Sequence, residues 1–273
     1  MKPIDFDRRF QLFALDWLKR HPGLKEDEID ARYNEMLAEW RDQPADWLGG
    51  STPGAYFQQF DNAEELAALI VEYDRAGIEL PEPLYSRIVE LGEASVEPLM
   101  AILEDGALSE KARAQALSIL GDIGTDAPLG TCAKLVARAE EAGDLVEAAA
   151  RRLEARVVAA RELLLDALDG ATDYGRQTLI DLLSNLPGDA RACELALYGL
   201  ANDSERRAFY AACLGKIGDP RAIEALQRVA ELADLSYYDY MEIVNAVEML
   251  GGEMDPVREF YGDPDYETLR FSE

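Results

Sequence analysis

One short pattern constrains the fold of this chain more than any other feature. Its clearest copy is Leu214-Gly215-Lys216-Ile217-Gly218-Asp219-Pro220-Arg221-Ala222, which reads as the end of one helix, a tight turn and the start of the next. Glycine permits such a turn, and an aspartate before a helix accepts the free N–H groups of its first turn. Gly188-Asp189-Ala190-Arg191-Ala192 repeats the turn 30 residues earlier, and Asp255-Pro256 repeats its start 36 residues later.

The pattern is periodic when the leucines that close each helix are aligned. A small residue follows the leucine in most copies, and the steps between copies are 29 to 36 residues: Leu91, Leu120, Leu153, Leu183, Leu214 and Leu250. Such a repeat has room for two helices of roughly 10–14 residues and two turns. A single pair cannot bury its own apolar face, so the pairs must stack. The sequence therefore predicts an all-α stack of helical hairpins.

Apolar residues are spread over all of these helices, and we expect them to form one continuous core: Leu99, Ile102, Leu103, Leu117, Ile119, Leu135, Leu163, Leu164, Leu179, Leu182, Leu195, Ile223 and Leu226. The segment 145–168 contains no glycine or proline, which favours one long or bent helix there.

The string 214–226, and the related turn at 120–126, resemble the short HEAT-like repeat found in phycobilisome bilin lyases. The resemblance covers about residues 83–262. It implies a right-handed α-solenoid whose second helices line a concave surface. It implies little about chemistry, because fold and function separate easily.

Three regions follow from this reading: an N-terminal helical cap over 1–80, the HEAT-like solenoid over 81–262, and a tail over 263–273. Helical spacing of apolar residues predicts helices over 8–20 and about 25–41 in the cap. Trp17, Trp40 and Trp47 lie in or beside them. A compact helical cap is the favoured reading of these rings, and an exposed anchor for a partner is the alternative.

The chain is strongly acidic, with 54 acidic and 27 basic side chains and a formal net charge of −27. Such a field repels phosphates, so we expect no nucleic-acid partner and no anionic membrane surface. No apolar run approaches the roughly 20 residues that a bilayer requires. We expect a cytoplasmic protein whose three cysteines, Cys132, Cys193 and Cys213, are buried and reduced.

No catalytic set, metal site or cofactor site is expected. The one histidine, His21, lies in a His-Pro-Gly turn, and no pair of cysteines has the spacing of a zinc site. The glycine-rich stretch 49–54 lacks the lysine of a phosphate-binding loop.

Three arginines share one position on successive second helices, each seven residues before a closing leucine: Arg113, Arg176 and Arg207. One interpretation is a structural ladder in which each guanidinium pairs with carboxylates of neighbouring repeats. The other is a cationic row that binds an anionic partner.

Aromatic residues give a second set of candidate partner-binding residues: Phe209, Tyr210, Tyr237, Tyr238 and Tyr240. These rings either anchor a partner or cap the end of the core.

The favoured hypothesis is a non-enzymatic interaction or scaffold module that binds a protein partner on its concave face, where a basic partner would complement the acidic chain. One alternative is a scaffold or dimer held through the tryptophan-rich end, and the other is an enzyme on a HEAT-like scaffold. The resemblance extends to bilin lyases, which handle a tetrapyrrole, and to alkylpurine DNA glycosylases. The net charge opposes the second of these, since a glycosylase needs a basic groove.

Overall fold

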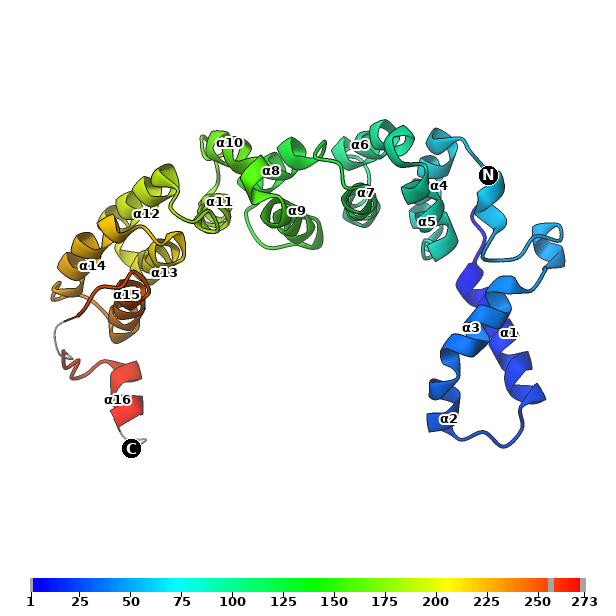
Figure 1. Ribbon diagram of the computed structural model, residues 1–273, viewed down its shortest axis with the longest axis horizontal. Helices are drawn as coiled ribbons and strands as arrows, with labels where there is room; N and C mark the ends of the chain where they lie inside the picture. Colours follow the sequence, from blue (N-terminus) through cyan, green and yellow to red (C-terminus); the bar gives the residue numbers. More distant parts are fainter. Residues whose placement is uncertain (1, 255–257, 271–273) are drawn as a thin grey trace. The chain divides into compact units, whose positions relative to one another are not determined.

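The computed structural model describes residues 2–254 and 258–270, so the Asp255-Pro256 copy of the turn lies outside the described residues. Within the described residues all regular secondary structure is helical (Figure 1). The α-helices are α1 (Phe6–Arg20), α2 (Glu26–Ala31), α3 (Tyr33–Asp42), α4 (Ala63–Ala76), α5 (Glu82–Glu90), α6 (Val96–Glu104), α7 (Glu110–Ile123), α8 (Leu129–Arg138), α9 (Asp144–Ala155), α10 (Val157–Ala167), α11 (Asp173–Ser184), α12 (Ala190–Asn202), α13 (Arg207–Ile217), α14 (Ile223–Ala230), α15 (Tyr237–Met249) and α16 (Pro264–Arg270). None of the helices in this described part is long and apolar enough to cross a membrane.

The chain folds as two compact units. The first contains the residues up to Pro128 together with Gly143–Ala148, and the second contains Leu129–Ala142 and the residues from Ala149 onward. In the first unit α1 packs on α3, and α4 to α7 pack on one another. In the second unit α8 packs on α10 and α11, and the pairs α10/α11, α12/α13 and α14/α15 follow. The stack of helical pairs expected from the sequence is therefore confirmed.

The predicted closing leucines lie at or near the ends of the second helices. Leu120, Leu153, Leu183 and Leu214 are buried in the last turns of α7, α9, α11 and α13. At Gly215 the small residue after the leucine lets the next second helix approach. A Cβ atom at Gly215 would lie 3.3 Å from Cα of Ala246 in α15. This position therefore sets how closely α13 and α15 pack.

The turn between α13 and α14 has the predicted chemistry. Gly218 has a φ of 73° in the left-handed region, which glycine adopts without strain. The carboxylate of Asp219 accepts a hydrogen bond from the backbone N–H of Arg221. Asp189 caps α12 in the same way, accepting from the N–H groups of Arg191 and Ala192. The reading of both aspartates as helix caps is confirmed.

Two helices expected to be continuous are interrupted in the structure. The predicted helix over about 25–41 divides into α2 and α3 at Arg32, and the segment 145–168 divides into α9 and α10 at Arg156. Arg156 has φ −127° and ψ 27°, outside the helical region. The break at Arg156 gives the chain the same two-helix unit there as elsewhere. Of the expected core residues, Leu163 is 38% exposed, which corrects its assignment to the core.

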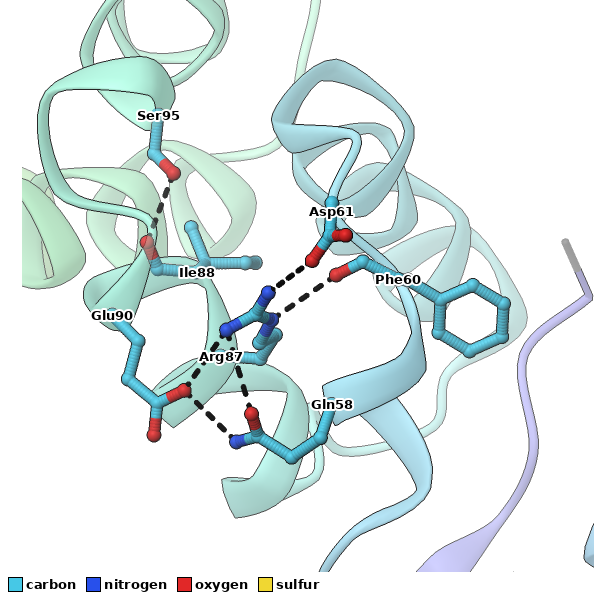
Figure 2. A network of polar contacts seen from close by, with 7 residues as sticks. All are labelled: Gln58, Phe60, Asp61, Arg87, Ile88, Glu90 and Ser95. Carbon is cyan, nitrogen blue, oxygen red and sulfur yellow. Dashed lines mark hydrogen bonds and ion pairs between the residues drawn. The ribbon is translucent and has the colours of Figure 1, made fainter.

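Polar contacts join the linker after the N-terminal helices to α5 (Figure 2). Arg87 donates from Nε to the carbonyl oxygen of Phe60 at 3.0 Å and from a terminal nitrogen to Asp61 at 2.5 Å. Its other terminal nitrogen donates a hydrogen bond to the carboxylate of Glu90 at 3.2 Å. The side-chain amide of Gln58 donates to the same carboxylate at 2.9 Å. The side chain of Arg87 is only 14% exposed, so these contacts fix the entry of the chain into α4.

The aromatic residues of the N-terminal region form their own small core. Phe6 lies 5.5 Å from the ring of Trp47 and 5.7 Å from that of Phe57. Trp17 is 1% exposed, and its indole N–H donates to Glu39 at 2.9 Å. The N-terminal segment is held to α4 because the Tyr73 hydroxyl bonds both the N–H and the carbonyl of Ile4. Burial raises the pKa of Tyr73 to about 12.

All three cysteines are free and buried, as expected, and all lie in the second unit. Burial raises the pKa of the Cys132 and Cys213 thiols to about 12 and also raises that of Cys193. These thiols are therefore protonated and shielded at neutral pH.

Asp189 gives the second unit a testable dependence on pH. Arg161 binds its two carboxylate oxygens at 2.6 and 3.3 Å, and this contact, with the capped N–H groups, holds the pKa of Asp189 below its ordinary value. A group with a depressed pKa stabilises the fold above its unfolded pKa, and this contribution is lost as pH falls through the folded pKa. We expect Asp189→Ala to lower the free energy of unfolding at pH 7 by about 1–3 kcal/mol, the sum of a lost cap and a lost charge pair.

Asp189→Asn separates the two contributions, because asparagine is an equally good helix cap without the charge. We expect the asparagine variant to lower the free energy of unfolding at pH 7 by less than the alanine variant does. We also expect its free energy of unfolding to fall less steeply below about pH 4 than that of the natural chain. Chemical unfolding of the three proteins between pH 3 and 7 measures both effects. If the free energy of unfolding of the asparagine variant falls with pH as steeply as that of the natural chain, this account is wrong.

Candidate partner-binding surface

The second helices α13 and α15 pack against each other and leave a groove between them on the surface of the second unit. Its floor consists of small residues, Ala212 from α13 and Ala246 from α15. The groove has a volume of about 480 Å³ and is bordered by Lys216, Glu242, Asn245, Glu248 and Met249. We call it the α13–α15 groove. An apolar floor with a polar border is the usual composition of a binding site.

Met249 projects at the edge of the α13–α15 groove. It is 65% exposed, although the residues that precede the closing leucine in three other pairs, Ile119, Leu182 and Cys213, are buried. The thioether lies beside Gly215, since a Cβ atom there would be 3.2 Å from Sδ of Met249. A flexible, polarisable side chain in this position suits contact with a partner surface.

The charges at the groove are mainly acidic. Lys216 is paired with Asp181 of α11 at 2.6 Å. Burial lowers the pKa of Lys216, but the hydrogen bond and charge of Asp181 outweigh it and hold that pKa above its ordinary value. Within the residues that the structure describes, Glu242 and Glu248 form no ion pair with the chain's own cations. Two carboxylates of the border are therefore available to a cation from outside.

The three predicted arginines are held by the chain itself. Arg113 donates to the carbonyl oxygen of Leu103 at 2.9 Å, and Arg176 donates to that of Leu168 at 3.2 Å. Each of these guanidinium groups binds the C-terminal end of the preceding helix, where carbonyl groups lack helical partners. Arg207 instead pairs with Asp234 at 3.4 Å, and its side chain is 13% exposed. Arg113 belongs to the first unit, and the other two belong to the second.

The predicted aromatic residues are divided between core and surface. Tyr210 is buried, and its ring fills the space against Gly199 of α12, where a Cβ atom would lie 2.2 Å from the ring. The half-buried Phe209 contacts the Tyr210 ring edge-on at 5.1 Å. Burial raises the pKa of Tyr210, consistent with this position.

The C-terminal residues cover part of α15. The ring of Phe260 lies 5.6 Å from Tyr237 and 5.1 Å from the buried Tyr240, and Tyr266 lies 5.3 Å from Tyr237. Tyr238 is the exposed member of the set, at 58%. Tyr210 and Tyr240 therefore do not form part of an exposed surface in this structure.

Sequence reasoning missed the residues that border the groove, Lys216, Glu242, Glu248 and Met249. A signal was present in the register of the repeat, because Met249 and Glu248 immediately precede a closing leucine and Lys216 follows one closely. Among the described residues no cluster of three or more His, Cys, Asp or Glu side chains is arranged to hold a metal ion.

Comparison with known protein families identifies one repeat. Residues 207–231 match the PBS lyase HEAT-like repeat, and they comprise α13, the turn at Gly218 and α14. The matched segment contains the turn motif that is clearest in the sequence. None of the curated proteins matches the chain.

Proposed function

We propose that the chain is a non-enzymatic binding module whose α13–α15 groove holds a basic and partly apolar segment of a partner protein. The observation that carries this proposal is the groove itself, in which the carboxylates of Glu242 and Glu248, which form no ion pair among the described residues, flank an apolar floor and the exposed Met249. A lysine or arginine side chain would pair with the carboxylates, while its apolar neighbours would contact the floor.

The charge of the whole chain supports a basic partner. A net charge of −27 attracts cationic proteins at long range and repels nucleic acids. Long-range attraction raises the association rate, whereas the groove supplies the specific contacts. The proposal therefore predicts that the affinity for the partner depends more on which acidic residues are present at the groove than on the total number of acidic residues.

A peptide-binding experiment tests the proposal directly. The probe is a fluorescent synthetic helix of leucine and lysine, and its binding is measured by anisotropy. We expect Glu242→Lys combined with Glu248→Lys to weaken binding by about tenfold or more, equivalent to about 1.4 kcal/mol, because both available carboxylates of the border are reversed.

The matched control is Glu194→Lys combined with Glu224→Lys, which changes the net charge equally but acts on α12 and α14. Both control side chains are exposed, at 61% and 84%. We expect this control to weaken binding by no more than about twofold, through the screened long-range term alone. Equal losses in the two double variants would show that the peptide senses only net charge, and the groove would be rejected as the binding site.

A further inference from the structure

We infer that the occupant of the α13–α15 groove is the α1 surface of a second copy of this chain. This inference rests on the proposed function, because it names the partner for the same groove. Two surfaces, one on each unit, support it. Exposed apolar side chains of each surface match a hollow or groove on the other, and cations of one match carboxylates of the other.

The α1 surface is an exposed stripe along α1 with basic ends and an apolar centre. Arg8, Leu12, Leu15 and Lys19 follow the spacing i, i+4, i+7 and i+11, which places them on one helical face. Leu12 is 54% exposed and Leu15 is 58% exposed, although the opposite face of α1 already buries Phe6 and Trp17 in the N-terminal core. The packing of this unit does not account for the second apolar face.

A hollow with aromatic walls lies beside this stripe. It has a volume of about 320 Å³, and its lining includes Leu12, Phe13, Trp40 and Trp47. Arg9 lines the same hollow, with its guanidinium carbon 5.2 Å from the centre of the Trp47 ring. Among the described residues neither Arg8 nor Arg9 forms an ion pair with a carboxylate of the chain.

The side chains that project from each surface match the features that the other surface offers. Met249 projects beside the α13–α15 groove, and the aromatic hollow offers the ring contacts that a methionine sulfur favours. Leu12 and Leu15 project from α1, and the groove offers the small residues Ala212 and Ala246. Among the described residues the carboxylates of Glu242 and Glu248 and the guanidinium groups of Arg8 and Arg9 form no ion pair within the chain, so the two sets can pair across the contact. Such complementarity selects a partner and its orientation.

The contact joins two different patches, so it is a heterologous contact. One helix face against one groove is a small interface, at the low end of the range for specific complexes. We therefore expect self-association with a midpoint of about 10–100 µM. Each copy carries a net charge of −27, so the local charge pairs act against a long-range repulsion, and salt screens both. Sedimentation equilibrium of the full chain between about 5 and 500 µM, at low and high salt, measures the self-association.

Two charge-reversed variants test which surfaces meet. We expect Arg8→Glu combined with Arg9→Glu to raise the midpoint at least tenfold, and Glu242→Lys combined with Glu248→Lys to do the same. An equimolar mixture of the two should associate again, because the acidic α1 of one then meets the basic groove of the other. The control pair, Glu194→Lys with Glu224→Lys, should associate as the natural chain does.

A natural chain that stays monomeric up to about 500 µM would overturn the inference, as would association that neither charge reversal weakens or a mixture that does not reassociate. These failures are distinguishable from failure of the proposed function. If the chain is monomeric but its groove still binds the leucine–lysine peptide, the groove function stands and the self-contact is rejected. Loss of both activities rejects both.

Discussion

Replacing Gly175 with alanine is expected to lower the free energy of unfolding of the second unit by about 3 kcal/mol, the upper part of the usual range for overpacking. A Cβ atom at this position would lie 2.4 Å from the carbonyl oxygen of Ala137 and 2.5 Å from that of Val136. Both atoms belong to the backbone of α8, so rotation of a side chain cannot relieve the clash. The first turn of α11 would have to move away from α8, and the bond from the N–H of Thr172 to Ala137 would be lost.

Gly121→Ala is the matched control for this prediction. Gly121 lies inside α7, and a Cβ atom there meets nothing within 4 Å. Alanine is favoured over glycine in a helix by about 1 kcal/mol, so we expect this variant to be slightly more stable than the natural chain. Urea unfolding followed by circular dichroism compares the two. If Gly175→Ala unfolds at the same urea concentration as Gly121→Ala, then α11 does not approach the backbone of α8 as closely as these distances require.

Trp17→Ala is expected to destabilise the N-terminal helices by about 3–5 kcal/mol, the usual cost of removing a large buried aromatic side chain. Trp17 is 1% exposed, stacks on His21 at 3.9 Å and binds Glu39 through its indole N–H. Its removal leaves a cavity between α1 and α3 and breaks one of the hydrogen bonds through which Glu39 joins the two helices, the other being that from Arg20. Hydrogen exchange of the amides of α1 and α3 measures the loss.

Tyr198→Ala is the corresponding control, because Tyr198 is a large aromatic residue that is 72% exposed. We expect its effect to remain within about 0.5 kcal/mol, as for most surface substitutions. Protection in α1 and α3 that is the same in Trp17→Ala as in the natural chain would mean that the indole is not part of a cooperative core.

The helical pairs could be predicted because their signals are local. Gly218 and Asp219 specify a turn and a cap within a few residues of each other, and the closing leucines repeat this information along the chain. The breaks at Arg32 and Arg156 carry no such signal, since neither position is glycine or proline. Where those helices end therefore depends on packing against other helices and not on a local signal.

The candidate site was less predictable for a related reason. The period of the repeat placed Arg113, Arg176 and Arg207 at one position, but the atom that each guanidinium reaches depends on the loop beside it. Two of them bind carbonyl groups of the preceding helix, and the third binds Asp234, 27 residues further along the chain. The exposure of Met249 likewise depends on its neighbours in space, and no alternation in the sequence distinguishes it from the buried Cys213.

The positions of the cysteines make the two halves of the chain chemically unequal. Every thiol of the chain belongs to the second unit, where burial keeps it protonated and out of reach of solvent. Thiol reagents attack the thiolate, so these cysteines can react only when the helices around them separate. The rate of thiol modification therefore measures how often the helices of the second unit separate. Separation of the helices in the first unit exposes no thiol and is not detected in this way.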